Sequence, residues 1–192
     1  MSLFKKIVDK ILNREEENQL TVEKLADQLK DADLDYKFAQ LFTLSGGYFN
    51  YCQDEAEALK TLQQIVKTEH IDSVFCCDED LKNFLSVLKT DYTEDLAKEN
   101  DAALITCEYL IAFDGRIMLS HNNIRHYPSS DLPQKIIIVA NVSQIVNSLN
   151  DAMMKVKRRG ALKNLTSISG SNSKLDGMKH DNNKLFLLLL ED

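Results

Sequence analysis

Two short and nearly uninterrupted apolar runs limit the folds open to this chain more than any other feature of its sequence. They cover residues 135–140, which read KIIIVA, and residues 185–190, which read LFLLLL. Continuous apolar character is typical of strands buried on both faces, as in parallel sheets with helices on each side. The second run is far shorter than the roughly 20 residues of a membrane-spanning helix. We therefore predict a parallel sheet that is covered on both faces.

Segments with helical periodicity alternate with further short strand patterns along the chain. Helices are predicted for residues 35–45, from Asp54 onward, from Asp78 onward, and from Asn141 or Ser143 through Val156. Strands are predicted for residues 48–52, 73–77, 102–105 and 117–119, whereas residues 106–112 fit either a helix or a strand. This alternation predicts a three-layer α/β/α domain with a mostly parallel sheet.

The first 33 residues carry two amphipathic patterns of their own. Apolar side chains recur at helical spacing over residues 3–12 and 22–29, with an acidic stretch at 15–17 between them. We expect an N-terminal helical extension, residues 1–33, ahead of one α/β domain, residues 34–192. The apolar faces of these helices suit either the core of the domain or a partner protein, and the sequence leaves both open.

The charge balance argues against several functions. The chain has 192 residues, with 23 Lys and Arg against 30 Asp and Glu, which gives a net charge of −7. A chain with this net charge repels polyanions, so a nucleic-acid partner is not expected. The N-terminus has helical periodicity instead of the apolar core of a signal peptide, and we expect a cytoplasmic protein without a membrane span.

The four cysteines do not have the spacing of a metal site. Cys52, Cys76, Cys77 and Cys107 lie in or beside apolar stretches, and the sequence contains no CxxC pair. Both an iron–sulfur cluster and a structural zinc site require other spacings, so we expect free thiols and no cofactor. His121 and His126 are likewise a poor metal pattern.

Two short polar segments are candidates for ligand binding. In an open α/β sheet a ligand sits at the carboxyl ends of the strands, here the loops after residues 77, 105, 119 and 140, and we add the loop at 167–174. The stretch 169–173 places hydroxyl and amide side chains around Gly170, where backbone N–H groups could meet an anion. Arg116, beyond the Asp114–Gly115 turn, could hold a carboxylate through two parallel hydrogen bonds. A flexible surface loop and a solvated hairpin turn are the alternatives.

Three further features have a structural as well as a chemical interpretation. Glu108 could act as a general base if it is buried. His180 stands beside Asp181, which could orient its ring. A cluster of cations falls at the end of the long predicted helix, where it would complement the helix dipole, and an anion-binding patch is the alternative. The cluster consists of Lys155, Lys157, Arg158 and Arg159.

From about Tyr36 to Asp192, the order of these pieces resembles the lactate-utilization (LUD) domain proteins of the LutC/YkgG type. Residues 37–47 look like the family's opening helix and the glycine before its first strand, and residues 54–56 look like the start of its next helix. Residues 103–117 resemble the family segment that ends in I-A-[ED]-T-G-T. Residues 168–176 resemble the family's G-P-S-x-T-x-D-I-E loop, and His180 is similar in position to the histidine of its G-x-H-G-P motif.

The resemblance implies a fold similar to the NagB/RpiA/CoA-transferase-like domains. It also implies a role in the oxidation of lactate to pyruvate, in which iron–sulfur partner subunits supply the electron carriers. Because this chain lacks cluster-binding cysteines, we expect an accessory subunit that binds a small carboxylate or phosphate and does not catalyse alone. The candidate ligand-binding residues are Asp114, Gly115, Arg116, Ser169, Gly170, Ser171, Asn172, Asp176 and His180.

Readings from other functional classes stay open. Phe113, Asp114 and Arg116 replace motif residues of the family, as does the stretch 171–174. These replacements favour a domain that has lost its ligand and serves as an interaction scaffold. An autonomous isomerase or CoA transferase would need a positioned general base, for which only Glu108 and His180 are candidates.

Overall fold

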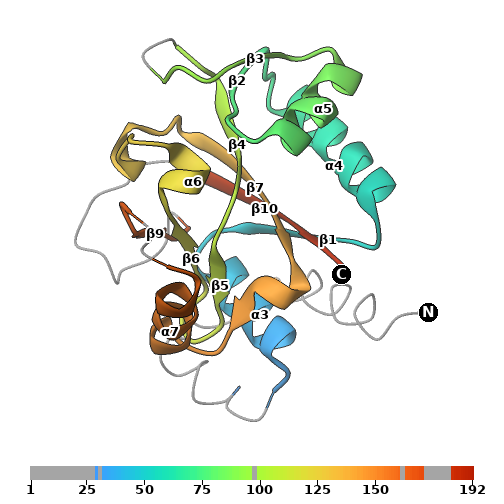
Figure 1. Ribbon diagram of the computed structural model, residues 1–192. Helices are drawn as coiled ribbons and strands as arrows, with labels where there is room; N and C mark the ends of the chain where they lie inside the picture. Colours follow the sequence, from blue (N-terminus) through green and yellow to red (C-terminus); the bar gives the residue numbers. More distant parts are fainter. Residues whose placement is uncertain (1–28, 30–31, 97–98, 161–162, 171–182) are drawn as a thin grey trace.

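The computed structural model describes residues 29, 32–96, 99–160, 163–170 and 183–192 (Figure 1). The helices predicted for residues 3–12 and 22–29 lie, apart from Leu29, outside the described residues. No helix of the described part is both long and apolar enough to cross a membrane.

The centre of the fold is a six-stranded sheet in which every pair of neighbouring strands is parallel. In spatial order its strands are β1 (Tyr48–Cys52), β10 (Lys184–Leu190), β7 (Lys135–Asn141), β4 (Ala102–Thr106), β2 (Ser73–Phe75) and β3 (Asp91–Thr93). The two apolar runs are β7 and β10, which lie side by side in the middle of the sheet. The predicted buried parallel strands are thus confirmed.

Two helices cover one face of this sheet. They are α4 (Glu55–Thr68) and α5 (Glu79–Leu88), and Figure 1 shows them on the same side of the sheet. The side chains of Asp54 and Asp78 cap them, accepting hydrogen bonds from backbone N–H groups of the first turn as predicted. Their apolar stripes pack on the sheet in one core cluster that includes Leu62, Leu85 and Leu188.

The other face is covered by a helix and a second, smaller sheet. The helix is α3 (Leu34–Leu44), and the sheet has the order β8 (Ile145–Val146), β5 (Tyr109–Ile111), β6 (Arg116–Leu119) and β9 (Thr166–Ile168). Phe42, Leu110 and Leu119 join the large sheet in a second core cluster. Helix α7 (Leu149–Arg159) lies on the outer side of the small sheet, where Ala152 and Val156 pack on Tyr109 and Ile111. The result is the expected three-layer α/β/α domain.

Several predicted boundaries were wrong. The long helix begins at Leu149 with Ser148 as its cap, because Asn141 is the last residue of β7, Ser143 belongs to a short turn, η2 (Val142–Gln144), and β8 follows it. Residues 121–134 contain α6 (His121–Ile124) and η1 (Ser129–Asp131). The start of the predicted 167–174 loop belongs to strand β9.

The strand predicted over residues 117–119 is β6, and β5 lies in the segment left open between helix and strand. Strands β8, β9 and β3 were not predicted because they are short and carry weak patterns. β8 has two residues, and the side chains of β9 are only half-buried. β3 is an edge strand of three residues, two of them exposed. Such segments form strands through their neighbours, so a one-dimensional apolar pattern does not reveal them.

Candidate functional site

The two strands β2 and β4 lie next to each other, and the chain leaves their carboxyl ends toward opposite faces of the large sheet. β2 is followed by α5 on one face, and β4 is followed by β5 of the small sheet on the other. A place where neighbouring connections diverge in this way is where open α/β sheets bind their ligands. Cys77 follows β2, and Cys107 and Glu108 follow β4, so these positions define the candidate site.

Glu108 is the buried carboxylate of this site. Its side chain is held from β6 and α6: Oε1 accepts a hydrogen bond from Ser120 Oγ at 2.5 Å and one from Asn122 Nδ2 at 3.2 Å. Glu108 is 8% exposed and Ser120 is fully buried. Both donors are neutral, and no ion pair to Glu108 occurs in the described part of the chain. The condition that the sequence analysis set for Glu108, burial, is therefore met.

Further hydrogen bonds fix the segments around Glu108. Asn123 Oδ1 accepts from the backbone N–H of Ser120 at 2.8 Å, and its Nδ2 donates to Thr106 Oγ1 at 3.1 Å. Gln144 Nε2 donates to the carbonyl of Cys107 at 2.6 Å. The end of β4, the start of α6 and η2 are thus tied together by side-chain amides, which limits how far Glu108 can move.

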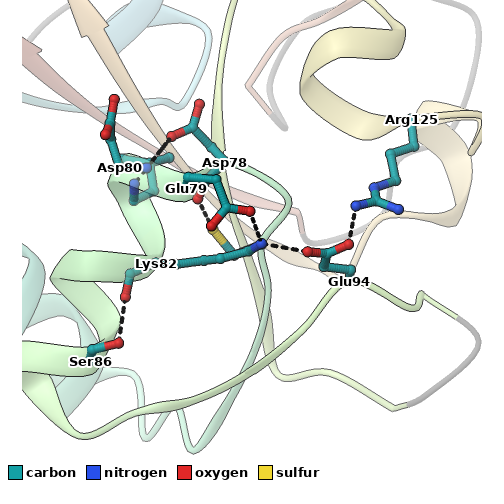
Figure 2. A network of polar contacts seen from close by, with 9 residues as sticks. Asp78, Glu79, Asp80, Lys82, Ser86, Glu94 and Arg125 are labelled. Atoms are coloured by element: carbon teal, nitrogen blue, oxygen red, sulfur yellow. Dashed lines mark hydrogen bonds and ion pairs between the residues drawn. The ribbon is translucent and has the colours of Figure 1, made fainter.

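A second group of polar side chains reaches the same edge of the sheet from α5, from the residue after β3 and from the residue after α6 (Figure 2). Lys82 is buried, and its Nζ donates to Glu79 Oε1 at 2.5 Å and to Glu94, which also pairs with Arg125. The hydrogen bonds that Lys82 donates to Glu79 and Glu94 raise the pKa of Lys82, and the one donated to Glu94 is the main cause that lowers the pKa of Glu94. Each of Lys82 and Glu94 thus stabilises the charged form of the other.

Helix α6 connects the two groups. Asn122 of α6 contacts Glu108, and Arg125, which directly follows α6, contacts Glu94. Arg125 is the helix C-cap and its side chain is about half exposed. A carboxylate, two amides and a guanidinium thus lie around one turn of helix at the carboxyl edge of the sheet.

The environment of the cysteines at this edge favours the neutral thiol. Burial raises the pKa of Cys76 to about 12 and also raises the pKa of Cys107. Burial raises the pKa of Cys77 as well, although the nearby Arg125 opposes the shift. All four cysteines are free, and the described residues contain no group of three or more side chains suited to hold a metal ion.

The predicted residues Asp114, Gly115 and Arg116 form the turn between β5 and β6. Arg116 Nε lies 2.9 Å from Asp114 Oδ2, and the backbone N–H of Arg116 donates to Asp114 Oδ1 at 3.2 Å. Gly115 has φ +72°, and a Cβ there would lie 2.6 Å from the backbone nitrogen of Phe42 in α3. The turn is therefore pressed against a helix, with the Arg116 charge paired to a neighbouring carboxylate.

Ser169 and Gly170 lie close to this turn. Strands β6 and β9 are antiparallel with Ile117 opposite Ile168, so the same register places Arg116 beside Ser169. A Cβ on Gly170 would lie 2.3 Å from the carbonyl oxygen of Ser45, just beyond the end of α3. The structure thus brings the described parts of both predicted segments together at α3. Ser171, Asn172, Asp176 and His180 lie outside the described residues.

The turn and Glu108 stand at opposite ends of the β5–β6 hairpin. Tyr109 pairs with Met118 and Ile111 with Arg116, so Glu108 lies beyond the open end and Asp114 within the closed end. Residues 109–113 lie between them, and the three residues of β5 alone span roughly 10 Å at 3.3 Å per residue. The sequence therefore pointed to the closed end, whereas the switch point of the large sheet lies at the open end.

The two loop histidines have different neighbours. The Nδ1 atom of His121 lies 3.1 Å from the backbone nitrogen of Lys163, and the ring of His126 packs on Tyr127 at 4.2 Å between centroids. Ser120, Asn123 and Arg125 were missed as site residues. The sequence signal that could have found them is the Ser-x-x-Asn pattern after β6, which forms a capping box at the start of α6.

The fold and these strand-end groups define an α/β/α domain with a polar site at the carboxyl edge of its parallel sheet. The LUD domain family model matches residues 36–180, so the chain belongs to the LUD domain family. Its fold is also similar to the crystal structure of a DUF162 family protein from Deinococcus radiodurans, with a TM-score of 0.62 and 18% identity. That match covers 84% of this chain and 98% of the other. No curated protein matches the chain.

Proposed function

We propose that this chain is a LutC-like accessory subunit of carboxylate utilization, and that it binds a small hydroxy acid of the lactate type at the carboxyl ends of β2 and β4. The observation that carries the proposal is the buried Glu108, whose carboxylate is held only by neutral donors among the described residues. A buried carboxylate without a cation is costly, and a ligand that donates a hydrogen bond to it offsets part of that cost.

The two ends of a hydroxy acid match two groups of the site. Its hydroxyl can donate to Glu108, because an ionised carboxylate has about four lone-pair positions and Ser120 and Asn122 use two. Its carboxylate can bind Arg125, whose guanidinium has five N–H donors. If the ligand displaces Glu94 from Arg125, Lys82 still neutralises Glu94. Recognition would then distinguish a hydroxy acid from the corresponding keto acid.

Membership of the LUD domain family and the state of the cysteines support the proposed accessory role. Cys52, Cys76 and Cys107 follow or end three different strands, and burial raises the pKa of each, to about 11 for Cys52. Metal ligation requires the thiolate, which these environments disfavour. In this proposal the chain presents the hydroxy acid in the cytoplasm, and iron–sulfur partner subunits take up the electrons.

Calorimetric titration of the full chain with lactate and with pyruvate tests the proposal. We expect lactate to bind more tightly than pyruvate, because pyruvate has no hydroxyl to donate to Glu108. Glu108→Gln and Arg125→Gln should each weaken lactate binding about tenfold, the loss expected for one charge-assisted hydrogen bond. Arg116→Gln is the matched control, since it removes the same charge at the closed end of the hairpin.

The outcomes separate the candidate positions. Loss of binding in Arg116→Gln with unchanged binding in Glu108→Gln would move the site to the predicted residues 114–116 and 169–170. If the wild-type chain binds neither acid, the proposal is wrong and the scaffold interpretation takes its place. Binding of lactate and pyruvate with equal affinity would remove the assigned role of Glu108.

A further inference from the structure

A second group of charges lies on the reverse side of β5, away from Glu108. Side chains of consecutive strand residues point to opposite faces, so Tyr109 points toward α7 while Glu108 points toward Ser120. Lys155 Nζ lies 5.7 Å and Arg159 Cζ 5.5 Å from the centre of the Tyr109 ring. Two cations from successive turns of one helix therefore converge on one aromatic side chain.

Neither cation is balanced by an acid in the described part of the chain, where no ion pair to Lys155 or Arg159 occurs. The carboxylate one turn before Lys155 is Asp151, and it is engaged as the partner of the Ser148 cap, with Oδ2 accepting from Ser148 N and Oγ. Like charges four residues apart on a helix repel each other. Lys155 and Arg159 thus have no acidic partner among the described residues to offset their mutual repulsion.

The helix dipole accounts for only part of this cluster. The last turn of α7 holds Lys157, Arg158 and Arg159, where cations complement the helix C-terminus as the sequence analysis proposed. Lys155 lies before that turn, and its direction over Tyr109 is shared with Arg159. Cation–π contact with the Tyr109 ring brings these two side chains together, and it leaves both positive charges without an acid among the described residues.

The hydroxyl of Tyr109 is the second, independent observation. Tyr109 is 2% exposed, yet its Oη has no hydrogen-bond partner among the residues that the structure describes. Buried tyrosine hydroxyls nearly always have one, because an unpaired polar group away from water is destabilising. The hydroxyl belongs to the ring that both cations contact, so an anion that reaches this ring could meet a phenol donor and two cations.

We propose that Tyr109, Lys155 and Arg159 form a binding site for a phosphoryl group, carried by inorganic phosphate or by a phosphomonoester. A dianionic phosphoryl group balances both charges, and its oxygens accept hydrogen bonds from ammonium, guanidinium and phenol together. The exposed side chains of Lys155 and Arg159 can move aside to admit the ligand and then close over it. The site is separate from the proposed hydroxy-acid site and does not depend on it.

Titration of the full chain with inorganic phosphate and with glycerol phosphate, at constant ionic strength, tests the proposal. We expect Lys155→Gln and Arg159→Gln to weaken binding about tenfold each. Arg158→Gln is the matched control, because it removes the same charge from the same helix without touching Tyr109, and binding should stay within about twofold of wild type. Tyr109→Phe should weaken binding several-fold without lowering the Tm, because it removes only a hydroxyl that has no partner.

Each result decides the matter. Tighter binding of glycerol phosphate than of phosphate identifies a phosphomonoester as the ligand, and the reverse identifies phosphate. No binding of either at 10 mM, roughly the weakest affinity of functional interest, overturns the proposal. An equal loss of phosphate affinity in Arg158→Gln also overturns it. Binding of an oligoglutamate peptide without binding of either phosphate overturns it as well and would indicate an acidic protein partner. Unchanged phosphate affinity in Glu108→Gln distinguishes this site from the hydroxy-acid site.

Discussion

The two ends of the β5–β6 hairpin hold carboxylates in opposite ways. At the closed end, Asp114 pairs with Arg116 within the same turn, and the turn is fixed by backbone contact with α3. At the open end, Glu108 is buried among a hydroxyl and an amide, with its segment fixed by side-chain hydrogen bonds. A carboxylate that already has its cation is structurally satisfied, whereas one held by neutral donors retains capacity for a ligand. A charged residue in a sequence motif is therefore a weaker indication of a binding site than a buried charged side chain that has no ion-pair partner in the folded protein.

The closed end should be the more sensitive to backbone changes. Gly115→Ala combines a positive φ of +72° with a Cβ 2.6 Å from the backbone of α3, so helix and turn must separate. We expect a loss of about 3 kcal/mol or more in the free energy of unfolding. Gly160→Ala is the matched control, with a positive φ of +108° but no atom within 4 Å of the new Cβ. It should cost only about 1 kcal/mol, and equal losses in a urea titration would contradict the proposed contact.

The open end should be sensitive to loss of the acceptor. Glu108→Ala leaves the buried hydroxyl of Ser120 without its partner, and we expect it to lower the free energy of unfolding by about 2 kcal/mol. Glu108→Gln keeps an acceptor oxygen and should cost less than half as much. Denaturant unfolding of the two variants measures the difference. If both are as stable as wild type, Glu108 does not hold the open end together.

The fold was more predictable than the site, and the reason lies in how each is encoded. β7 and β10 are continuous apolar segments, and this pattern alone predicts that they are buried. Asp54 and Asp78 are local sequence signals for the start of a helix. The Glu108 group instead joins β4, β6 and α6 through residues 12 to 14 positions apart. Its partners Ser120 and Asn122 are ordinary loop residues until the hairpin folds back. No periodic pattern in the sequence predicts such a long-range contact. The sequence therefore indicated Glu108 as a candidate but did not indicate its hydrogen-bond partners.

Lowering the pH should reduce the stability of the edge of the site beside α6. The pKa of Glu94 is lowered by Lys82, so at a pH near the ordinary value of a Glu, about 4.3, the unfolded chain binds more protons there than the folded chain. The stability contributed by Glu94 is thus present above that pH and is lost as pH falls through the folded pKa. Glu94→Gln should flatten this part of the Tm-against-pH curve below pH 5. A curve parallel to that of wild type would show that the Lys82–Glu94–Arg125 group does not stabilise this edge.

Salt gives the smallest and most discriminating effect. The Asp114–Arg116 pair is partly exposed, with side chains 16% and 28% exposed, so its coupling energy in a double-mutant cycle should be about 0.5–1 kcal/mol and should fall as salt screens it. The effect of Glu108→Ala should be the same in low and high salt, because its partners are neutral and buried. The measurement is urea unfolding of Asp114→Asn, Arg116→Gln and the double variant at about 0.05 M and 1 M salt, with Glu108→Ala beside them. The proposed difference would be wrong if the Asp114–Arg116 coupling energy did not change with salt. It would also be wrong if the destabilisation by Glu108→Ala changed with salt as that coupling does.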